Sequence, residues 1–302
     1  MKKASLFVRT RFKLSEHPEW DQPRNRLLWT DIDGGGVYAY HADTGALEQL
    51  YQGPKVGAFT QQGDGSLILF RESDVAWLSP EGKVQVLWKV SDPGMVRFND
   101  VIADPAGRVF AGTIAATPGS AVLYQFEPDG EFDVLFRNAT CPNGMGFSPD
   151  MRTFYWTRSS RRQILAFDYD VALGALSNER VFVQFQGDPK PDGLAVDSEG
   201  CIWSAVWGAG MVVRFEPKEG REMSRIEVPS QYPTSLCFWG AQLELLAITS
   251  ERPHPEADTD DGCVFLAEPG VKGVLPFLSH IVTAGEPQPQ VGAFLGAAAA
   301  GE

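Results

Sequence analysis

The stretch VRFNDVIADPAGRVFAGT, residues 96–113, contains the pattern that decides the fold. It begins with Arg97, Asn99 and Asp100, passes through an apolar run and a turn at DPAG, and ends in a second apolar run. Short apolar runs bounded by Gly, Pro, Asn and Asp are typical of β-strands joined by tight turns. The polar residues at the head of the first strand indicate that this end faces something other than a hydrophobic core.

The second half of this stretch recurs along the chain. Each unit also has further apolar runs before and after it, each bounded by turn residues, and helical periodicity is nearly absent. The segments RLLWTDI, GSLILF, GRVFAGT, RTFYWT, GCIWSAV and LELLAIT carry markers spaced 40, 42, 45, 48 and 42 residues apart: Leu28, Ile68, Phe110, Tyr155, Trp203 and Leu245. Six units of about four short strands predict an all-β fold, a six-bladed β-propeller. A two-sheet sandwich is the alternative, and six units in register speak against it.

A chain of 302 residues exceeds the size at which one hydrophobic core stops growing, which suits repeated cores. We expect a single propeller domain over residues 1–282, in which residues 4–12 could close the last blade by supplying its missing strand. Residues 283–302, TAGEPQPQVGAFLGAAAAGE, break the pattern and are interpreted as a low-complexity tail, disordered or loosely attached.

Composition excludes several kinds of partner. The balance of 26 Lys and Arg against 39 Asp and Glu gives a net charge of −13, which disfavours nucleic acid. No apolar run is long enough to span a membrane, and the first residues lack the apolar core of a signal peptide. The four cysteines form no CxxC pair and are interpreted as buried free thiols in a reducing compartment, so we expect a cytoplasmic protein.

Polar residues precede the innermost strand of most units. Their spacings are 83, 44, 49 and 43 residues, which follow the repeat, and unit two has no such residue: Glu16, Asn99, Asn143, Asp192 and Ser235. Because the innermost strands of a propeller line its channel, we expect these side chains to converge on the axis. Carboxylate and amide oxygens together suit hard divalent cations such as Ca²⁺, Mg²⁺ and Mn²⁺. The alternative is that the Asn-Gly and Asp-Gly pairs simply form turns.

The ordered motifs SEHPEWD, LLWTDI, RFNDVIADPAGRVFAGT, NGMGFSPD, AFDYD, PDGLAVDSEGCIWSA and PTSLCFWG resemble those of the SMP-30/gluconolactonase/luciferin-regenerating-enzyme family, the regucalcin-like proteins. The resemblance covers about residues 10–276. It implies a six-bladed propeller that holds one divalent cation (Ca²⁺, Mg²⁺, Mn²⁺, Fe²⁺ or Zn²⁺) at one channel mouth. It also implies Glu16, Asn143 and Asp192 as metal ligands, Asn99 as a ligand or substrate contact, and Arg97 as a substrate contact.

The usual chemistry of this family is the hydrolysis of sugar lactones, which implies a carboxylic-ester hydrolase. The cation would polarise the lactone carbonyl and activate a water molecule. Asp192 would act as general base, and Arg97 would stabilise the developing oxyanion. The only partner expected is a small-molecule lactone, and the protein is expected to be a monomer or small homo-oligomer.

Two segments depart from the family pattern. After FAGT the chain reads IAATPGSAV, without the acidic or polar substrate contacts that are common there, and YWTRSS places Arg158 where an Asp is common. A pocket with Arg97 and Arg158 would suit an acidic or less hydroxylated lactone, unless Arg158 faces solvent. Trp207 could wall the pocket or belong to a blade core. His17 is interpreted as a solvated turn residue, and support of Glu16 is the alternative.

Two other functions remain open. A cation that polarises a carbonyl can also polarise a phosphoryl group, so a phosphotriesterase-like hydrolase is one alternative. A non-catalytic propeller that binds calcium or serves as a scaffold is the other, because a fold does not fix a function. Two carboxylates and two amides in phase with the repeat favour a functional site over a bare scaffold: Glu16, Asp192, Asn99 and Asn143.

Overall fold

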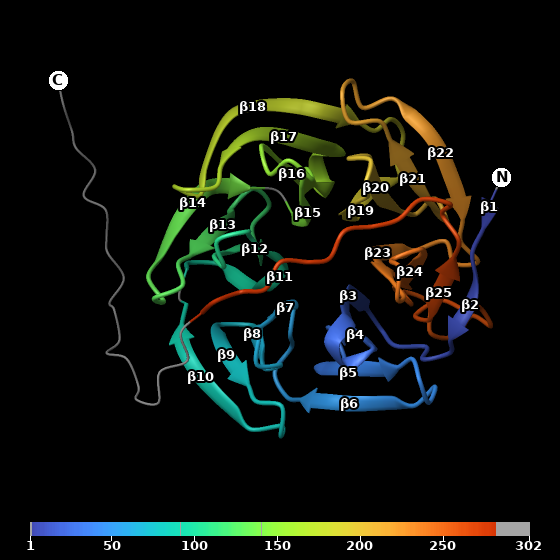
Figure 1. The fold of residues 1–302 in the computed structure, drawn as a ribbon, viewed down its shortest axis with the longest axis horizontal. Helices are drawn as coiled ribbons and strands as arrows, with labels where there is room; N and C mark the ends of the chain where they lie inside the picture. The colour runs from blue at the N-terminus through green and yellow to red at the C-terminus, as the bar shows by residue number, and fades with distance from the viewer. Residues whose placement is uncertain (1, 91, 140, 282–302) are drawn as a thin grey trace.

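The computed structural model describes residues 2–90, 92–139 and 141–281, so the low-complexity tail predicted at residues 283–302 lies outside the described residues. Six β-sheets surround a central axis in Figure 1, which confirms the predicted all-β, six-bladed propeller. All six marker residues lie on the second strand of a blade. Only two single-turn 3₁₀ helices occur in the described ranges, η1 (Gln22–Arg24) and η2 (Ser159–Arg161), and no helix there is long and apolar enough to cross a membrane.

The first five blades are each built from four consecutive antiparallel strands, of which the first lies innermost. Blade one contains β3 (Ser15–Asp21), β4 (Arg26–Asp31), β5 (Gly36–His41) and β6 (Leu47–Gln52). Blade two contains β7 (Ala58–Gln61), β8 (Leu67–Phe70), β9 (Asp74–Leu78) and β10 (Val84–Lys89). Blade three contains β11 (Met95–Ala103), β12 (Val109–Ala115), β13 (Ala121–Phe126) and β14 (Phe132–Ala139). Blade four contains β15 (Pro142–Phe147), β16 (Thr153–Arg158), β17 (Gln163–Asp170) and β18 (Ala175–Gln184). Blade five contains β19 (Lys190–Val196), β20 (Ile202–Trp207), β21 (Met211–Phe215) and β22 (Glu222–Glu227).

The sixth blade joins the two ends of the described chain. Its three inner strands are β23 (Pro233–Trp239), β24 (Leu245–Ser250) and β25 (Val264–Ala267), and its outer strand is β2 (Ser5–Val8), from within the segment 4–12. The strand β1 (Lys2–Lys3) pairs in parallel with β22 of blade five. Residues 2–8 therefore extend one blade and complete the next, which leaves β25 paired on both sides.

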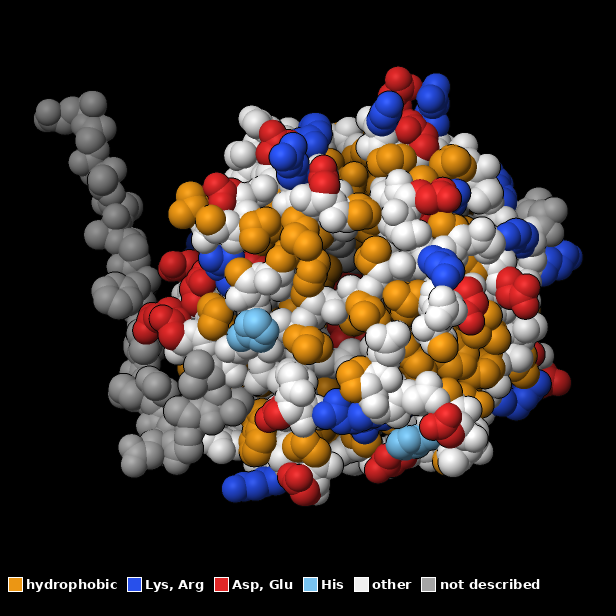
Figure 2. All heavy atoms as spheres, viewed as in Figure 1, with side chains coloured by type: hydrophobic (Ala, Val, Ile, Leu, Met, Phe, Trp, Pro, Cys, Tyr) orange, Lys and Arg blue, Asp and Glu red, His pale blue; other side chains and the backbone are white. Residues whose placement is uncertain are grey.

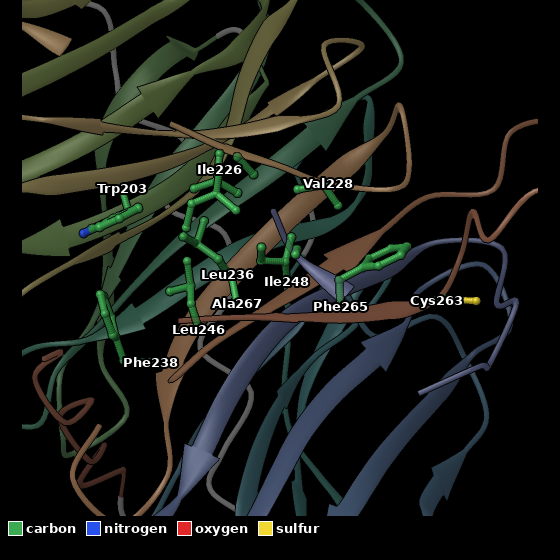
Figure 3. Close-up of a cluster of buried hydrophobic side chains, with 13 residues drawn as sticks. Trp203, Ile226, Val228, Leu236, Phe238, Leu246, Ile248, Cys263, Phe265 and Ala267 are labelled. Atoms are coloured by element: carbon green, nitrogen blue, oxygen red, sulfur yellow. The ribbon is translucent and has the colours of Figure 1, made fainter. Parts of the chain in front are cut away.

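Hydrophobic side chains fill the spaces between adjacent blades. Six separate clusters of buried side chains occur, one at each of the six blade interfaces. Figure 3 shows the cluster between blades five and six, which contains Trp203 and Ile226 of blade five together with Leu246 and Phe265 of blade six. Each such fully buried side chain contributes roughly 1.5–3 kcal/mol through removal of apolar surface from water. The chain thus stabilises itself with a ring of interblade cores.

The segment after β25 covers one mouth of the central channel. It crosses the face of the ring shown in Figure 1 and touches blade five through the Asp197–Gly273 bridge and blade two through the Gln62–Ser279 bridge. Behind it lies a cavity of about 130 Å³, lined in part by residues 274–277 of this segment. Figure 2 shows the same face, where hydrophobic side chains gather towards the middle and charged ones towards the rim. Ser235, the polar residue at the head of β23, lines this cavity together with His17 and Asp100, whereas Glu16, Asn99, Asn143 and Asp192 are not part of its lining.

Candidate functional site

The innermost strands that begin with a polar residue share an irregularity: near that residue, the register of pairing with the second strand of the blade shifts. The innermost strand of blade two, β7, pairs with β8 without a shift and has no polar residue at its head. A β-bulge bends its strand and changes the direction of its side chains. The irregular pairing thus changes the direction in which the polar side chains point. The register shifts lie between Glu16 and Glu19, Phe98 and Val101, Pro142 and Met145, Pro191 and Leu194, and Pro233 and Leu236.

The Asn-Gly and Asp-Gly pairs lie within strands and not in turns. A Cβ atom on Gly144 would lie 2.3 Å from the backbone nitrogen of Leu194, and one on Gly193 would lie 2.6 Å from Cα of Ser235. Both distances are far below van der Waals contact, so only glycine lets neighbouring innermost strands approach this closely. The glycines bring successive blades together at the level where Asn143 and Asp192 meet the axis.

A chain of hydrogen bonds joins the polar heads of blades three and four. Arg97 donates from Nη1 to Asn99 Oδ1 at 2.5 Å, and Asn99 donates from Nδ2 to Asn143 Oδ1 at 2.8 Å. Asn143 in turn donates from Nδ2 to Ser159 Oγ at 2.9 Å. These hydrogen bonds fix the orientation of the Asn99 and Asn143 amides. Ser159 was not singled out in the sequence, because a serine after a strand carries no motif.

Two carboxyl groups, the buried Glu16 and the half-buried Asp192, interact electrostatically. Burial and the charge of Asp100 raise the pKa of Glu16 to about 8. Burial and the charge of Glu16 raise the pKa of Asp192 well above its usual range, and burial lowers the pKa of Arg97, which lies near both carboxyl groups. The charge of Glu16 thus disfavours ionisation of Asp192, and Arg97, which lowers the pKa of both carboxyl groups, offsets only part of the cost of burying them.

These residues fit a divalent cation. Asp192 Oδ1 is buried and has no hydrogen-bond partner in the part of the chain that the structure describes. Nowhere in that part do three or more His, Cys, Asp or Glu side chains cluster as metal ligands, so a cation here needs amide oxygens beside the two carboxylates. Asn143 is placed to supply one. Asn99 Oδ1 accepts from Arg97 and Asn143 Oδ1 accepts from Asn99, so each amide oxygen keeps one lone pair for a cation, and Asn99 also positions its two neighbours.

His17 is buried, so its interpretation as a solvated turn residue is wrong. Its backbone N–H donates to Glu16 Oε2 at 3.0 Å, and its ring donates from Nδ1 to Asp100 at 2.8 Å and from Nε2 to the carbonyl of Phe59 at 2.7 Å. Burial lowers the pKa of His17, but hydrogen bonds to Asp100 and Glu19 outweigh it and raise the pKa to about 10. His17 is therefore an imidazolium that supports Glu16, and its φ of 51° comes from the bulge.

Arg158 is not brought into this group. Its guanidinium lies 5.7 Å from the ring centroid of Trp156 and 3.5 Å from Glu179 of the outer strand β18. Trp207 is half-buried and donates from Nε1 to Glu251 Oε2 at 2.6 Å. The sequence did not predict that the Glu251 carboxylate lies near the site. No motif surrounds Glu251, and only the packing of blades five and six reveals it.

Comparison with known proteins adds a family and a set of relatives. The model of the family described as SMP-30/Gluconolactonase/LRE-like region matches residues 14–252. Pentonolactonase XacC of Haloferax volcanii is 36% identical over 256 residues, which cover 84% of this chain and 87% of the relative. Regucalcin of Gallus gallus is 32% identical over 283 residues, which cover 88% and 95%. A solved structure described as a calcium-binding protein, regucalcin, from Agrobacterium tumefaciens has a TM-score of 0.84 at 24% identity, covers 93% and 98% of the two chains, and supports the fold.

Proposed function

The chain belongs to the SMP-30/gluconolactonase/LRE-like family, and from this premise we propose that it is a lactonase that opens a sugar-type lactone with the help of one divalent cation. The observation that carries the proposal is Asp192 Oδ1, a buried carboxylate oxygen that has no partner among the described residues. Asp192 feels the charge of Glu16, and its backbone lies against Gly144, next to Asn143, so three blades contribute to this region. A pentonolactonase and a regucalcin among the relatives support the reaction class and the cation.

Glu16, Asn143 and Asp192 would hold the cation. When bound, it polarises the lactone carbonyl and makes a nearby water molecule more acidic. The set is made of oxygen donors only, which favours Ca²⁺, Mg²⁺ or Mn²⁺ over metals that prefer nitrogen and sulfur ligands. Sequence and structure support this set of ligands without selecting one ion.

The remaining steps belong to side chains of this chain. Asp192 takes a proton from a water molecule while the water oxygen attacks the lactone carbonyl carbon. Asp192 then gives the proton to the ring oxygen when the C–O ester bond breaks. The product is the open hydroxy acid. Arg97 is held by Asn99 and donates to the oxygen on which negative charge develops. Asn143 is oriented by Asn99 and Ser159, so its oxygen needs no rearrangement to bind.

Lactone hydrolysis followed by pH-stat tests the proposal, with a panel of sugar lactones and with protein before and after removal of divalent cations. We expect turnover of at least one lactone, its loss on stripping, and its return with a single added cation. Asp192→Ala should lower kcat/KM by about 10²-fold or more while the fold is retained. Asp188→Ala is the matched control, because Asp188 is exposed and precedes the same strand.

Other outcomes select the other functions. Full activity of Asp192→Ala would contradict the assignment of the site. Turnover of phosphotriesters without turnover of any lactone would identify the phosphotriesterase-like alternative. Cation binding without turnover of either substrate class would indicate a calcium-binding protein, and the absence of both would indicate a scaffold.

A further inference from the structure

Glu251 and Trp207 form a rim pair, defined by these two residues, at the end of the channel that holds the candidate metal ligands. Glu251 directly follows β24 and forms an isolated bridge with Leu14, two residues before Glu16. The indole Nε1–H of Trp207 donates to Glu251 Oε2 at 2.6 Å. The rim pair thus joins blades five and six on the side of the channel that faces Glu16.

Trp207 places the same pair close to Asp192. It ends β20 and pairs with Lys190, two residues before Asp192 on the innermost strand of blade five. The Lys190 ammonium lies 5.5 Å from the indole centroid, and the ring of Tyr232 lies 5.1 Å from it. Trp207 is therefore fixed on several sides, and it fixes the Glu251 carboxylate in turn.

The carboxylate of Glu251 is poorly satisfied for a half-buried charge. No Lys, Arg or His in the described ranges forms an ion pair with it, and Trp207 is its one hydrogen-bond donor there. Burial raises the pKa of Glu251, whereas the Trp207 hydrogen bond and the charge of Arg97 lower it. A half-buried carboxylate that accepts one hydrogen bond has room for further donors, and a purely structural residue would ordinarily have found them.

We propose that Glu251 determines specificity by accepting a hydrogen bond from a ring hydroxyl of the lactone, with Trp207 holding the carboxylate in place. This inference rests on the proposed lactonase function. Arg97 donates at the reacting carbonyl, and Glu251 accepts at the hydroxylated side of the ring, so the site selects a neutral polyhydroxylated lactone. The acidic lactone considered from the sequence fits less well, because Glu251 supplies the negative charge that IAATPGSAV lacks. A site built to bind a hydroxyl discriminates strongly against analogues that lack it.

The experiment compares wild type with Glu251→Gln and Trp207→Phe on two probes, D-ribono-1,4-lactone and γ-butyrolactone, which share the lactone ring and differ in hydroxyl groups. We expect Glu251→Gln to lower kcat/KM for ribonolactone by about 10- to 100-fold, mainly through KM, and to change kcat/KM for butyrolactone by less than about threefold. Trp207→Phe should cause a smaller loss with the same selectivity. Glu256→Gln is the matched control, because it removes one charge from an exposed side chain in the neighbouring loop.

The outcomes distinguish failure of the proposed lactonase function from failure of the specificity role of Glu251. If wild type hydrolyses neither probe nor any other lactone, the proposed function fails and Glu251 loses its role with it. If wild type is active and Glu251→Gln lowers both probes equally, or leaves ribonolactone unchanged, the proposed function stands and the specificity role is overturned. Thermal unfolding of each variant shows whether a loss of activity on both probes reflects misfolding. If Glu251→Gln misfolds, Trp207→Phe, which keeps the Glu251 charge, tests the specificity role instead: a selective loss on ribonolactone supports that role, and an equal loss on both probes overturns it.

Discussion

At the scale of single residues, the two axial carboxyl groups are arranged for a ligand at a cost to the folded chain. Burial raises the pKa of both Glu16 and Asp192, and the charge of Glu16 raises the pKa of Asp192 further. The folded, cation-free protein therefore holds protons that the unfolded chain releases at lower pH. Between pH 4.5, the ordinary pKa of Glu16, and about 8, its folded value, stability falls as the pH rises. A divalent cation reverses this penalty by neutralising both groups.

Replacement of Asp192 by Asn should therefore stabilise the cation-free protein while it abolishes cation binding. The substitution removes a carboxyl group whose ionisation is opposed by burial and by the charge of Glu16, and it keeps the shape of the side chain. At pH 7.5 we expect the Tm of the cation-free variant to rise by about 2 °C or more. Added Ca²⁺ or Mg²⁺ should raise the Tm of wild type but not of the variant. Differential scanning calorimetry with Asp188→Asn as control measures both effects, and a lower Tm of the cation-free variant would contradict the proposed repulsion.

At the scale of strands, much of the fold could be predicted from the sequence because the repeat leaves regular apolar patterns. Each marker from Leu28 to Leu245 lies on the second strand of its blade. The bulges could not be predicted, since one extra residue in β11 or β19 leaves hydrophobicity almost unchanged. The positions of Ser159 and Glu251 depend on which blades meet at the axis. Contacts between residues far apart in the sequence have no local signal, and hydrogen bonds of this kind complete the candidate site.

The close approach of β15 and β19 can be tested with two glycines on one strand. Gly144→Ala places a Cβ 2.3 Å from a backbone nitrogen, whereas Gly146→Ala places it 2.8 Å from side-chain atoms of Leu194 and Val196, which can move. We expect Gly144→Ala to lower the free energy of unfolding by about 3 kcal/mol or more, and Gly146→Ala by about 1 kcal/mol. Urea denaturation measures both. Because Gly144 follows Asn143, only Gly144→Ala should also weaken cation binding, and equal losses from the two variants would argue against a backbone clash.

At the scale of the whole molecule, the ring is closed twice. Residues 2–8 pair with blades five and six, and the segment after β25 crosses the covered mouth to reach blades two and three. The N-terminal strands and the segment after β25 both connect the ends of the described chain to blades that are far away in sequence. Because every interblade core needs its neighbour in place, the ring is expected to unfold as one unit, and the candidate metal ligands come from blades one, four and five. Closure therefore also keeps those ligands at fixed separations.

Removal of β2 should accordingly destabilise the entire propeller. Deletion of residues 2–8 exposes the edge of β25 and removes Ala4 and Leu6 from the core between blades five and six, whereas deletion of residues 2–3 removes only the short pairing with β22. We expect the longer deletion to lower the Tm by about 10 °C or more and to promote aggregation through the open edge. The shorter deletion should lower the Tm by less than about 4 °C. Calorimetry and size-exclusion chromatography follow the two effects. If the longer deletion unfolded in one transition near the wild-type Tm, β2 would be dispensable, and the interblade cores alone would hold the ring together.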